Sequence, residues 1–215
     1  MNLALTASFS DAPTIATMTQ SLLPFILTTF ALVGSPGPNT LSVAAVGAAF
    51  GRQQGMPYLV GICLGVGLVV LLVASGLAGL VLAYPGVKPI VTICAGMYLC
   101  YLAFKIATAK PLQSRDDQTG ATPPVWYAGT LLSLANPKAY ASVAATFSQF
   151  VLIDNVLSDS LLKAAIFMSA IVLVNVAWLL IGSALSHHMS NLRTSKYINR
   201  LFAILLLLSV ALVVV

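Results

Sequence analysis

The segment Ser35-Pro36-Gly37-Pro38-Asn39 interrupts an apolar run that extends from about Leu22 to Phe50. Proline has no backbone N–H and glycine weakens a helix, so this segment predicts a break inside a helix. Backbone groups freed by such a break are very unfavourable in hydrocarbon. If the run crosses a membrane, the break therefore persists only where other parts of the protein or a water-filled cavity satisfy those groups.

The composition indicates in which environment this apolar run lies. The chain has 215 residues, of which 59% are hydrophobic and only 7% are charged. A soluble domain has about 25% charged residues, so the composition predicts an integral membrane protein in a lipid bilayer. The formal charge of +5 does not indicate a nucleic-acid partner, because the basic residues are spread through short loops and form no patch.

The apolar runs predict an all-α membrane fold with six spans, each near or above the ~20 residues that a bilayer requires. A second break, Asn136-Pro137-Lys138, interrupts the fourth run, so the first and fourth helices are predicted to be broken. The six predicted spans are 22–50, 57–83, 87–106, 125–153, 161–185 and 197–215.

The chain divides into a tail and one transmembrane domain. Residues 1–17 are rich in Ser, Thr and Ala and contain no Lys or Arg, so we expect a disordered N-terminal tail and not a signal peptide. The sequence leaves open whether translation starts at Met1 or Met18. The six-helix transmembrane domain, residues 18–215, consists of the halves 18–106 and 125–215, joined by a cytoplasmic linker at 107–124 that is rich in Pro and Asp.

The two halves are predicted to form a 3+3 inverted repeat. Aligning Pro38 with Pro137 brings Gly37-Pro38-Asn39 onto Asn136-Pro137-Lys138, while identity elsewhere is negligible. Three spans per half make the second half enter the membrane from the opposite side. Broken helices at corresponding positions of two such halves are typical of the binding site of a secondary transporter, which works by alternating access.

Basic residues predict the orientation of the spans. Seven Lys and Arg residues lie in the first, third and fifth loops, whereas only Lys88 and Lys163 lie in the others. By the positive-inside rule, the first, third and fifth loops are cytoplasmic, and both termini face the periplasm.

The free helix ends at each break suit a zwitterionic ligand. Unpaired N–H groups at Asn39 and Thr40 would bind a carboxylate, and free carbonyls at Val33 and Gly34 would accept from an ammonium. The candidate substrate-binding residues are Gly34, Pro36, Gly37, Pro38, Asn39, Thr40, Asn136, Pro137 and Lys138.

Lys138 adds a full positive charge to the second break. A lysine at the centre of a span costs roughly 2.5–3.5 kcal/mol on insertion scales. The sequence has no Glu, and all five Asp lie outside the apolar runs, so Lys138 must face water, carbonyls or an anionic substrate. The alternative is that Lys138 extends to an interface. Without a carboxylate inside a span, proton coupling through Lys138 and uncoupled efflux both stay open.

Other chemistry has little support in the sequence. Cys63, Cys94 and Cys100 have no CxxC spacing and lie away from the breaks, so neither a metal site nor a redox pair is predicted. No nucleophile–base arrangement indicates catalysis, and no cofactor is implied. Glycines spaced by four predict close helix packing, within the chain or in a homodimer.

These motifs resemble the LysE/RhtB family of amino acid exporters. The similarity rests on Ser-Pro-Gly-Pro-Asn-Thr at 35–40, Gly-Arg-Gln-Gln-Gly at 51–55 and Asn-Pro-Lys-Ala at 136–139, and it covers the chain from Met18 onward. It implies a bacterial inner-membrane exporter of amino acids or their derivatives. Many relatives carry Asp where this chain has Asn39, and some relatives that carry Asn are associated with neutral substrates, so the resemblance favours a small neutral substrate here. A divalent metal-ion exporter or a membrane thiol-redox conduit of similar architecture is the alternative.

Overall fold

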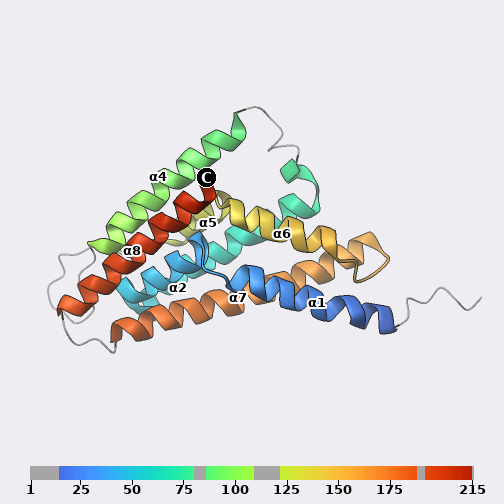
Figure 1. The fold of residues 1–215 in the computed structure, drawn as a ribbon, viewed down its shortest axis with the longest axis horizontal. Helices are drawn as coiled ribbons and strands as arrows, with labels where there is room; N and C mark the ends of the chain where they lie inside the picture. The colour runs from blue at the N-terminus through green and yellow to red at the C-terminus, as the bar shows by residue number, and fades with distance from the viewer. Residues whose placement is uncertain (1–14, 80–85, 109–121, 188–191, 215) are drawn as a thin grey trace, which may run out of the picture.

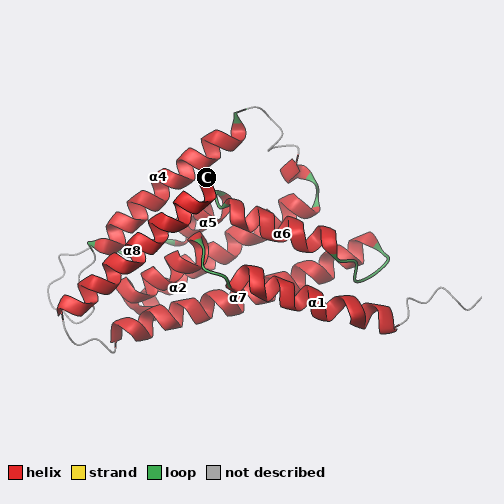
Figure 2. Ribbon diagram, in the orientation of Figure 1, coloured by secondary structure: helices red, strands yellow, loops and turns green. Residues whose placement is uncertain are grey.

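The computed structural model describes residues 15–79, 86–108, 122–187 and 192–214. Within them every regular element is a helix and none is a strand (Figure 2), which confirms the all-α prediction. The helices are α1 (Ile15–Gly34), α2 (Pro38–Ala74), α4 (Val87–Ala107), α5 (Trp126–Leu134), α6 (Pro137–Gln149), α7 (Val156–His187) and α8 (Leu192–Val214) (Figure 1).

Both helix breaks occur where the sequence predicts them. The first lies at Ser35–Gly37, between α1 and α2, and the second lies at Ala135–Asn136, between α5 and α6. In each case a proline, Pro38 or Pro137, is the first residue of the helix that follows. This position suits proline because the first N–H groups of a helix have no partner within the helix.

The first two predicted spans meet at Gly51, inside α2, where the backbone leaves the helical conformation with a φ of 77° and a ψ of 170°, in the left-handed region of φ that favours glycine. A Cβ on Gly55 would lie 3.4 Å from the Val46 side chain, so the chain turns back at Gly51, as the boundary between the two spans predicts. The predicted C-terminal end of the second span is wrong. α2 then ends at Ala74, before the predicted end at residue 83, because Gly76 again adopts a positive φ of 75°. Residues 80–83 lie outside the described residues.

The other predicted boundaries agree more closely with the helices. α4 matches the third span, α5 and α6 together match the fourth, and α7 and α8 begin before the fifth and sixth. α1 begins at Ile15 and thus includes the last residues of the predicted tail, whose residues 1–14 lie outside the described part. Most of the predicted linker, residues 109–121, also lies outside it.

Two of the described helices are long and apolar enough to cross a membrane, namely residues 38–74 and 156–185. Shorter apolar helical segments occur at residues 21–34, 96–107 and 197–208. The outer face of α4 exposes large apolar side chains, including Met97 at 62% and Phe104 at 69%. A contiguous face of this kind is suited to lipid and not to water.

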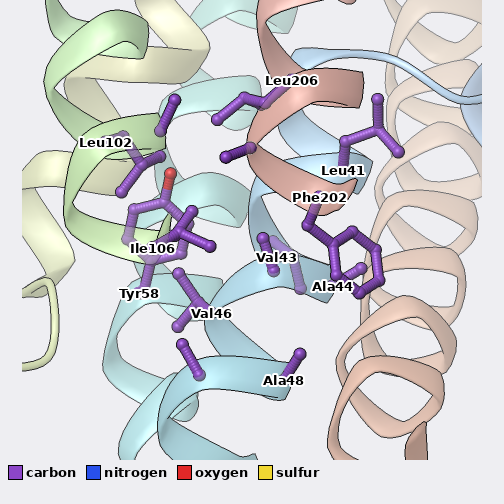
Figure 3. Close-up of a cluster of buried hydrophobic side chains, with 14 of the residues drawn as sticks. Leu41, Val43, Ala44, Val46, Ala48, Tyr58, Leu102, Ile106, Phe202 and Leu206 are labelled. Atoms are coloured by element: carbon purple, nitrogen blue, oxygen red, sulfur yellow. The ribbon is translucent and has the colours of Figure 1, made fainter. Parts of the chain in front are cut away.

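The long helix α2 forms the centre of the molecule and packs against α5, α7 and α8, while α4 packs against α8. The main hydrophobic core lies between α2, α4 and α8. Figure 3 shows Tyr58 of α2 beside Leu102 and Ile106 of α4, with Phe202 and Leu206 of α8 on the other side of the cluster.

Glycines allow α2 to approach its neighbours at backbone distance. A Cβ built on Gly61 would meet the carbonyl of Trp126, and one on Gly129 would meet the carbonyl of Tyr58, so α2 and α5 are in direct backbone contact. A Cβ on Gly47 would likewise meet the carbonyl of Leu179 in α7. The spaced glycines of α2 therefore serve packing within the chain.

Lys163 is not the loop residue that the charge count assumed. It lies in the first turns of α7, is only 3% exposed, and pairs with Asp159 one turn earlier. Its ammonium also donates to the carbonyls of Phe147 and Phe150, and the Asp159 carboxylate accepts from the N–H groups of Leu152 and Ile153. The cluster holds the connection between α6 and α7 in place.

Candidate functional site at the two helix breaks

The two breaks are capped in different ways. In the second break, the Asn136 side chain accepts a hydrogen bond from the Lys138 N–H at 3.1 Å, which is a typical N-cap. Gly37 has no side chain to cap α2, and instead its own N–H donates to the Thr40 hydroxyl at 3.0 Å. The hydroxyl of Thr40 thereby fixes the entry into α2.

A chain of buried amides joins the breaks. Asn136 Nδ2 donates to Asn39 Oδ1 at 2.9 Å, and Asn39 Nδ2 donates to Ser133 Oγ at 3.1 Å. The Ser133 hydroxyl donates in turn to the carbonyl of Ile62 at 3.1 Å. All three polar side chains are less than 9% exposed. The network holds the start of α2 against α5 and α6, so the Asn39 side chain connects helices and is not free to bind a ligand.

Lys138 reaches from the second break to the first. Its Nζ donates to the Ser35 carbonyl at 2.6 Å, the Ser35 hydroxyl at 2.8 Å and the Pro36 carbonyl at 3.3 Å. An ammonium has three donors, and these acceptors match that number. Both carbonyls lie at the C-terminal end of α1, where the helix dipole favours a cation. Lys138 therefore faces carbonyls within the protein, as one of the sequence-based hypotheses required.

Gly37 makes room for this contact. A Cβ at Gly37 would lie 2.8 Å from Lys138 Cδ and 2.9 Å from its Nζ, closer than real Cβ contacts allow. The φ of Gly37 is −170°, extended backbone that any residue can adopt, so the requirement is for space and not for conformational freedom. By contrast, a Cβ at Gly34 would have no neighbour within 4 Å.

A cavity of about 40 Å³ opens between the breaks and α7. This is room for about three water molecules at roughly 10–15 Å³ each. Its polar side is formed by Gly37, Asn39, Thr40, Asn136, Lys138, Ser142 and Asn175, and its apolar side by Leu32, Val33, Val66, Ala139, Phe167 and Ile171.

Five of the nine predicted binding residues thus line one cavity, and four do not. Pro38 and Pro137 serve as the first residues of α2 and α6, and the Pro36 carbonyl holds Lys138. Gly34 ends α1 and does not border the cavity. The prolines shape the breaks, and the residues beside them provide the cavity surface.

The sequence reasoning missed the contribution of α7. Asn175 lines the cavity together with Ile171 and Phe167, which lie one and two turns before it on the same face of α7. The signal was present, since Asn175 is a polar residue inside the apolar run 161–185, and polar residues within a span are functional candidates.

The electrostatics of the cavity favour an anion at the polar side. The N-terminal ends of α2 and α6 both point to the breaks, each with a partial positive charge from its dipole, and Lys138 adds a full charge. No Asp or Glu is among the residues that line the cavity. A carboxylate on a molecule with an apolar portion matches both sides of this surface.

No group of three or more His, Cys, Asp or Glu side chains that could hold a metal ion occurs among the described residues. Cys63 and Cys100 are free thiols, and the side chain of Cys94 lies outside the described part.

Comparison with known proteins gives a consistent picture. A model of the LysE type translocator family matches residues 30–215. The chain is 28% identical over 130 residues to a leucine efflux protein of Enterobacter sp. (strain 638), covering 59% of this chain and 62% of the relative. It is 32% identical over 120 residues to a leucine efflux protein of Klebsiella pneumoniae, covering 54% of this chain and 56% of the relative.

A cysteine/O-acetylserine efflux protein of Escherichia coli (strain K12) is 28% identical over 167 residues, covering 77% of this chain and 84% of the relative. The chain spans somewhat more than half the length of the leucine efflux proteins that it matches. No solved structure matches it.

Proposed function

The chain belongs to the LysE type translocators, and from this premise we propose that it exports neutral amino acids across the inner membrane of a bacterium. Its relatives are named as efflux proteins for leucine and for cysteine or O-acetylserine, which are amino acids without a net charge. This similarity supports amino acid export over the metal-ion exporter and the thiol-redox conduit.

The contact between Lys138 and the first break carries this proposal. It places an ammonium at a cavity with a positive polar side, where a substrate carboxylate is the complementary group. The apolar lining from Leu32, Val66, Phe167 and Ile171 suits the side chain of an amino acid such as leucine. These features support Lys138 as the residue that binds the carboxylate, with Gly37, Thr40 and Asn136 beside it, while the Asn39 side chain holds the helices that form the cavity.

Substrate binding must compete with the contacts that Lys138 makes in this structure. All three ammonium donors are engaged by Ser35 and Pro36, so a carboxylate binds Lys138 by replacing at least one of them. That exchange loosens α6 from the end of α1. The cavity of about 40 Å³ also has to widen before a leucine fits.

A six-span inverted repeat would allow the replacement of a Lys138 contact by the substrate carboxylate to be coupled to movement of the two halves. Two features support it: both breaks place proline first in the following helix, and α4 and α8, the third spans of the two halves, pack against each other. In such a repeat the two halves rock around a central site. The site would be reached first from the cytoplasm and then from the periplasm.

The arrangement of helix ends supports the proposed topology. The C-terminal ends of α4 and α7 and the N-terminal end of α8 lie at one end of the molecule, on the left in Figure 1. The N-terminal ends of α1 and α7 lie at the opposite end. We assign the first end to the cytoplasm, because the predicted loops there hold most of the Lys and Arg.

Transport of L-leucine by the purified protein in proteoliposomes tests the proposal. We expect counterflow of radiolabelled leucine by the wild type and a loss of at least about tenfold in Lys138→Met, since a bond to a charged group is worth about 1.5–3 kcal/mol. Lys105→Met, which removes a lysine from the last turn of α4, is the matched control. Wild-type counterflow by Lys138→Met would remove Lys138 from the binding surface.

The same vesicles test how export is driven. An imposed pH gradient accelerates wild-type efflux if Lys138 carries a proton, and Lys138→Arg abolishes that acceleration, because a guanidinium does not release its proton. If wild-type flux ignores the gradient, export proceeds down the amino acid gradient alone.

A further inference from the structure

Asn175, which lines the cavity, has an unpaired acceptor in its side chain. Its side chain is 1% exposed, and its Nδ2 donates to the carbonyl of Ile171 at 2.8 Å. Its Oδ1 has no hydrogen-bond partner among the described residues. Because Asn175 lines the cavity, this acceptor is available to a molecule that enters it.

The orientation of the Asn175 amide is set by its surroundings. Exchanging its oxygen and nitrogen would place Oδ1 against the carbonyl oxygen of Ile171, and two acceptors repel each other. The group without a partner is therefore an acceptor and not a donor. Such a group attracts an N–H or O–H of a ligand.

The other amides at the cavity are already engaged. Asn39 Oδ1 accepts from Asn136, and Asn136 Oδ1 accepts from the Lys138 N–H. No carboxylate lines the cavity, so an ammonium that enters it has only neutral acceptors available. Asn175 lies on α7, whereas Lys138 lies on α6, so the two groups approach a ligand from different helices.

We propose that Asn175 Oδ1 accepts a hydrogen bond from the ammonium group of the substrate while Lys138 binds its carboxylate. The inference rests on the proposed function and extends it, because it makes Asn175 the residue that distinguishes an amino acid from the same acid without its amino group. A deaminated acid keeps the contact with Lys138 and loses the contact with Asn175.

Calorimetric titration of the purified protein in detergent tests this inference with two probes. L-leucine has both charged groups, and 4-methylpentanoate has the same carboxylate and isobutyl group but no ammonium. We expect the wild type to prefer leucine by about 10- to 100-fold. Asn175→Leu, which keeps the side-chain size and removes the acceptor, should bind leucine about 10- to 100-fold more weakly and 4-methylpentanoate within about twofold of wild type.

Two further variants serve as controls. Asn175→Thr has a hydroxyl that can donate to the Ile171 carbonyl and still accept from an ammonium, so it should retain a preference for leucine. Thr29→Val removes another buried oxygen without a partner, that of Thr29 in α1, which does not line the cavity. Thr29→Val should therefore leave both affinities unchanged.

The outcomes separate the two proposals. If the wild type binds neither probe, the proposed function fails and this inference fails with it. If the wild type binds leucine and Asn175→Leu keeps the full preference over 4-methylpentanoate, only the role of Asn175 is wrong. An equal loss of affinity for leucine and 4-methylpentanoate in Asn175→Leu would also contradict the role of Asn175 in binding the ammonium, since the amide would then only support the fold. Asn175→Ala replaces Asn175→Leu, with the same expected result, if the leucine variant does not fold.

Discussion

The two helix breaks have the same backbone arrangement, but one supplies hydrogen-bond acceptors and the other a hydrogen-bond donor. Each ends one helix and begins the next with a proline, Pro38 or Pro137. The first break supplies acceptors, the carbonyls of Ser35 and Pro36, whereas the second supplies the ammonium of Lys138 that binds to them. The comparison teaches that a repeated backbone geometry does not require repeated chemistry. A donor in one half and acceptors in the other make the two breaks interdependent.

Gly37→Val is expected to have the largest effect on this interdependence. The new Cβ would meet the Lys138 side chain at 2.8 Å and push its ammonium away from Ser35 and Pro36. Because the displaced atoms are the flexible end of a lysine, the protein should still fold. Leucine counterflow should fall by about tenfold or more, because the displaced ammonium no longer lies where it would bind the substrate carboxylate, and a bond to a charged group is worth about 1.5–3 kcal/mol.

Gly34→Ala is the matched control for Gly37→Val. A Cβ at Gly34 has no neighbour within 4 Å, so counterflow should stay near wild type although the change lies in the same break. Equal losses in both variants would show that any side chain in this segment is harmful. The space for Lys138 would then not be the reason for glycine at position 37.

Asn136→Ala removes the side-chain cap that distinguishes the second break. The change loses the N-cap bond to the Lys138 N–H, worth about 1 kcal/mol, and leaves the buried Asn39 Oδ1 unpaired at a cost of about 1–3 kcal/mol. The melting temperature in detergent should therefore fall by several degrees.

Thr40→Val is the companion change in the first break. It removes the hydroxyl that accepts from the Gly37 N–H, and Asn39 and Asn136 keep their bond. Its loss of melting temperature should be smaller than that of Asn136→Ala. If Thr40→Val lowered the melting temperature more than Asn136→Ala, the Thr40 hydroxyl would stabilise the protein more than the Asn136 cap does.

Ser35→Ala should have the smallest effect. It removes one of the three acceptors of the Lys138 ammonium, and the two carbonyls remain. The ammonium keeps two acceptors and water can replace the third, so the net loss should stay below the roughly 1.5–3 kcal/mol of a bond to a charged group and leucine counterflow should change by less than about tenfold. A complete loss of counterflow would indicate that the hydroxyl itself contacts the substrate.

Local sequence determined the helices and their breaks. Proline and glycine act on the backbone of their own segment, so the breaks at residues 35–37 and 135–136 could be located without a structure. The same holds for the all-α class and for Lys138 as a charge that needs acceptors. The end of α2 at Ala74 was missed, because it depends on a positive φ at Gly76 that an uninterrupted apolar run does not reveal.

Tertiary packing decided which of these residues meet. Ser35 and Lys138 are far apart in the sequence, and they come together because glycines let α2 contact α5 and α7 at backbone distance. The same packing engages Asn39 with Ser133, leaves Gly34 away from the cavity and brings Asn175 of α7 to it. Periodicity and propensity are properties of neighbouring residues, whereas the surface of a cavity between helices depends on how those helices are placed in space.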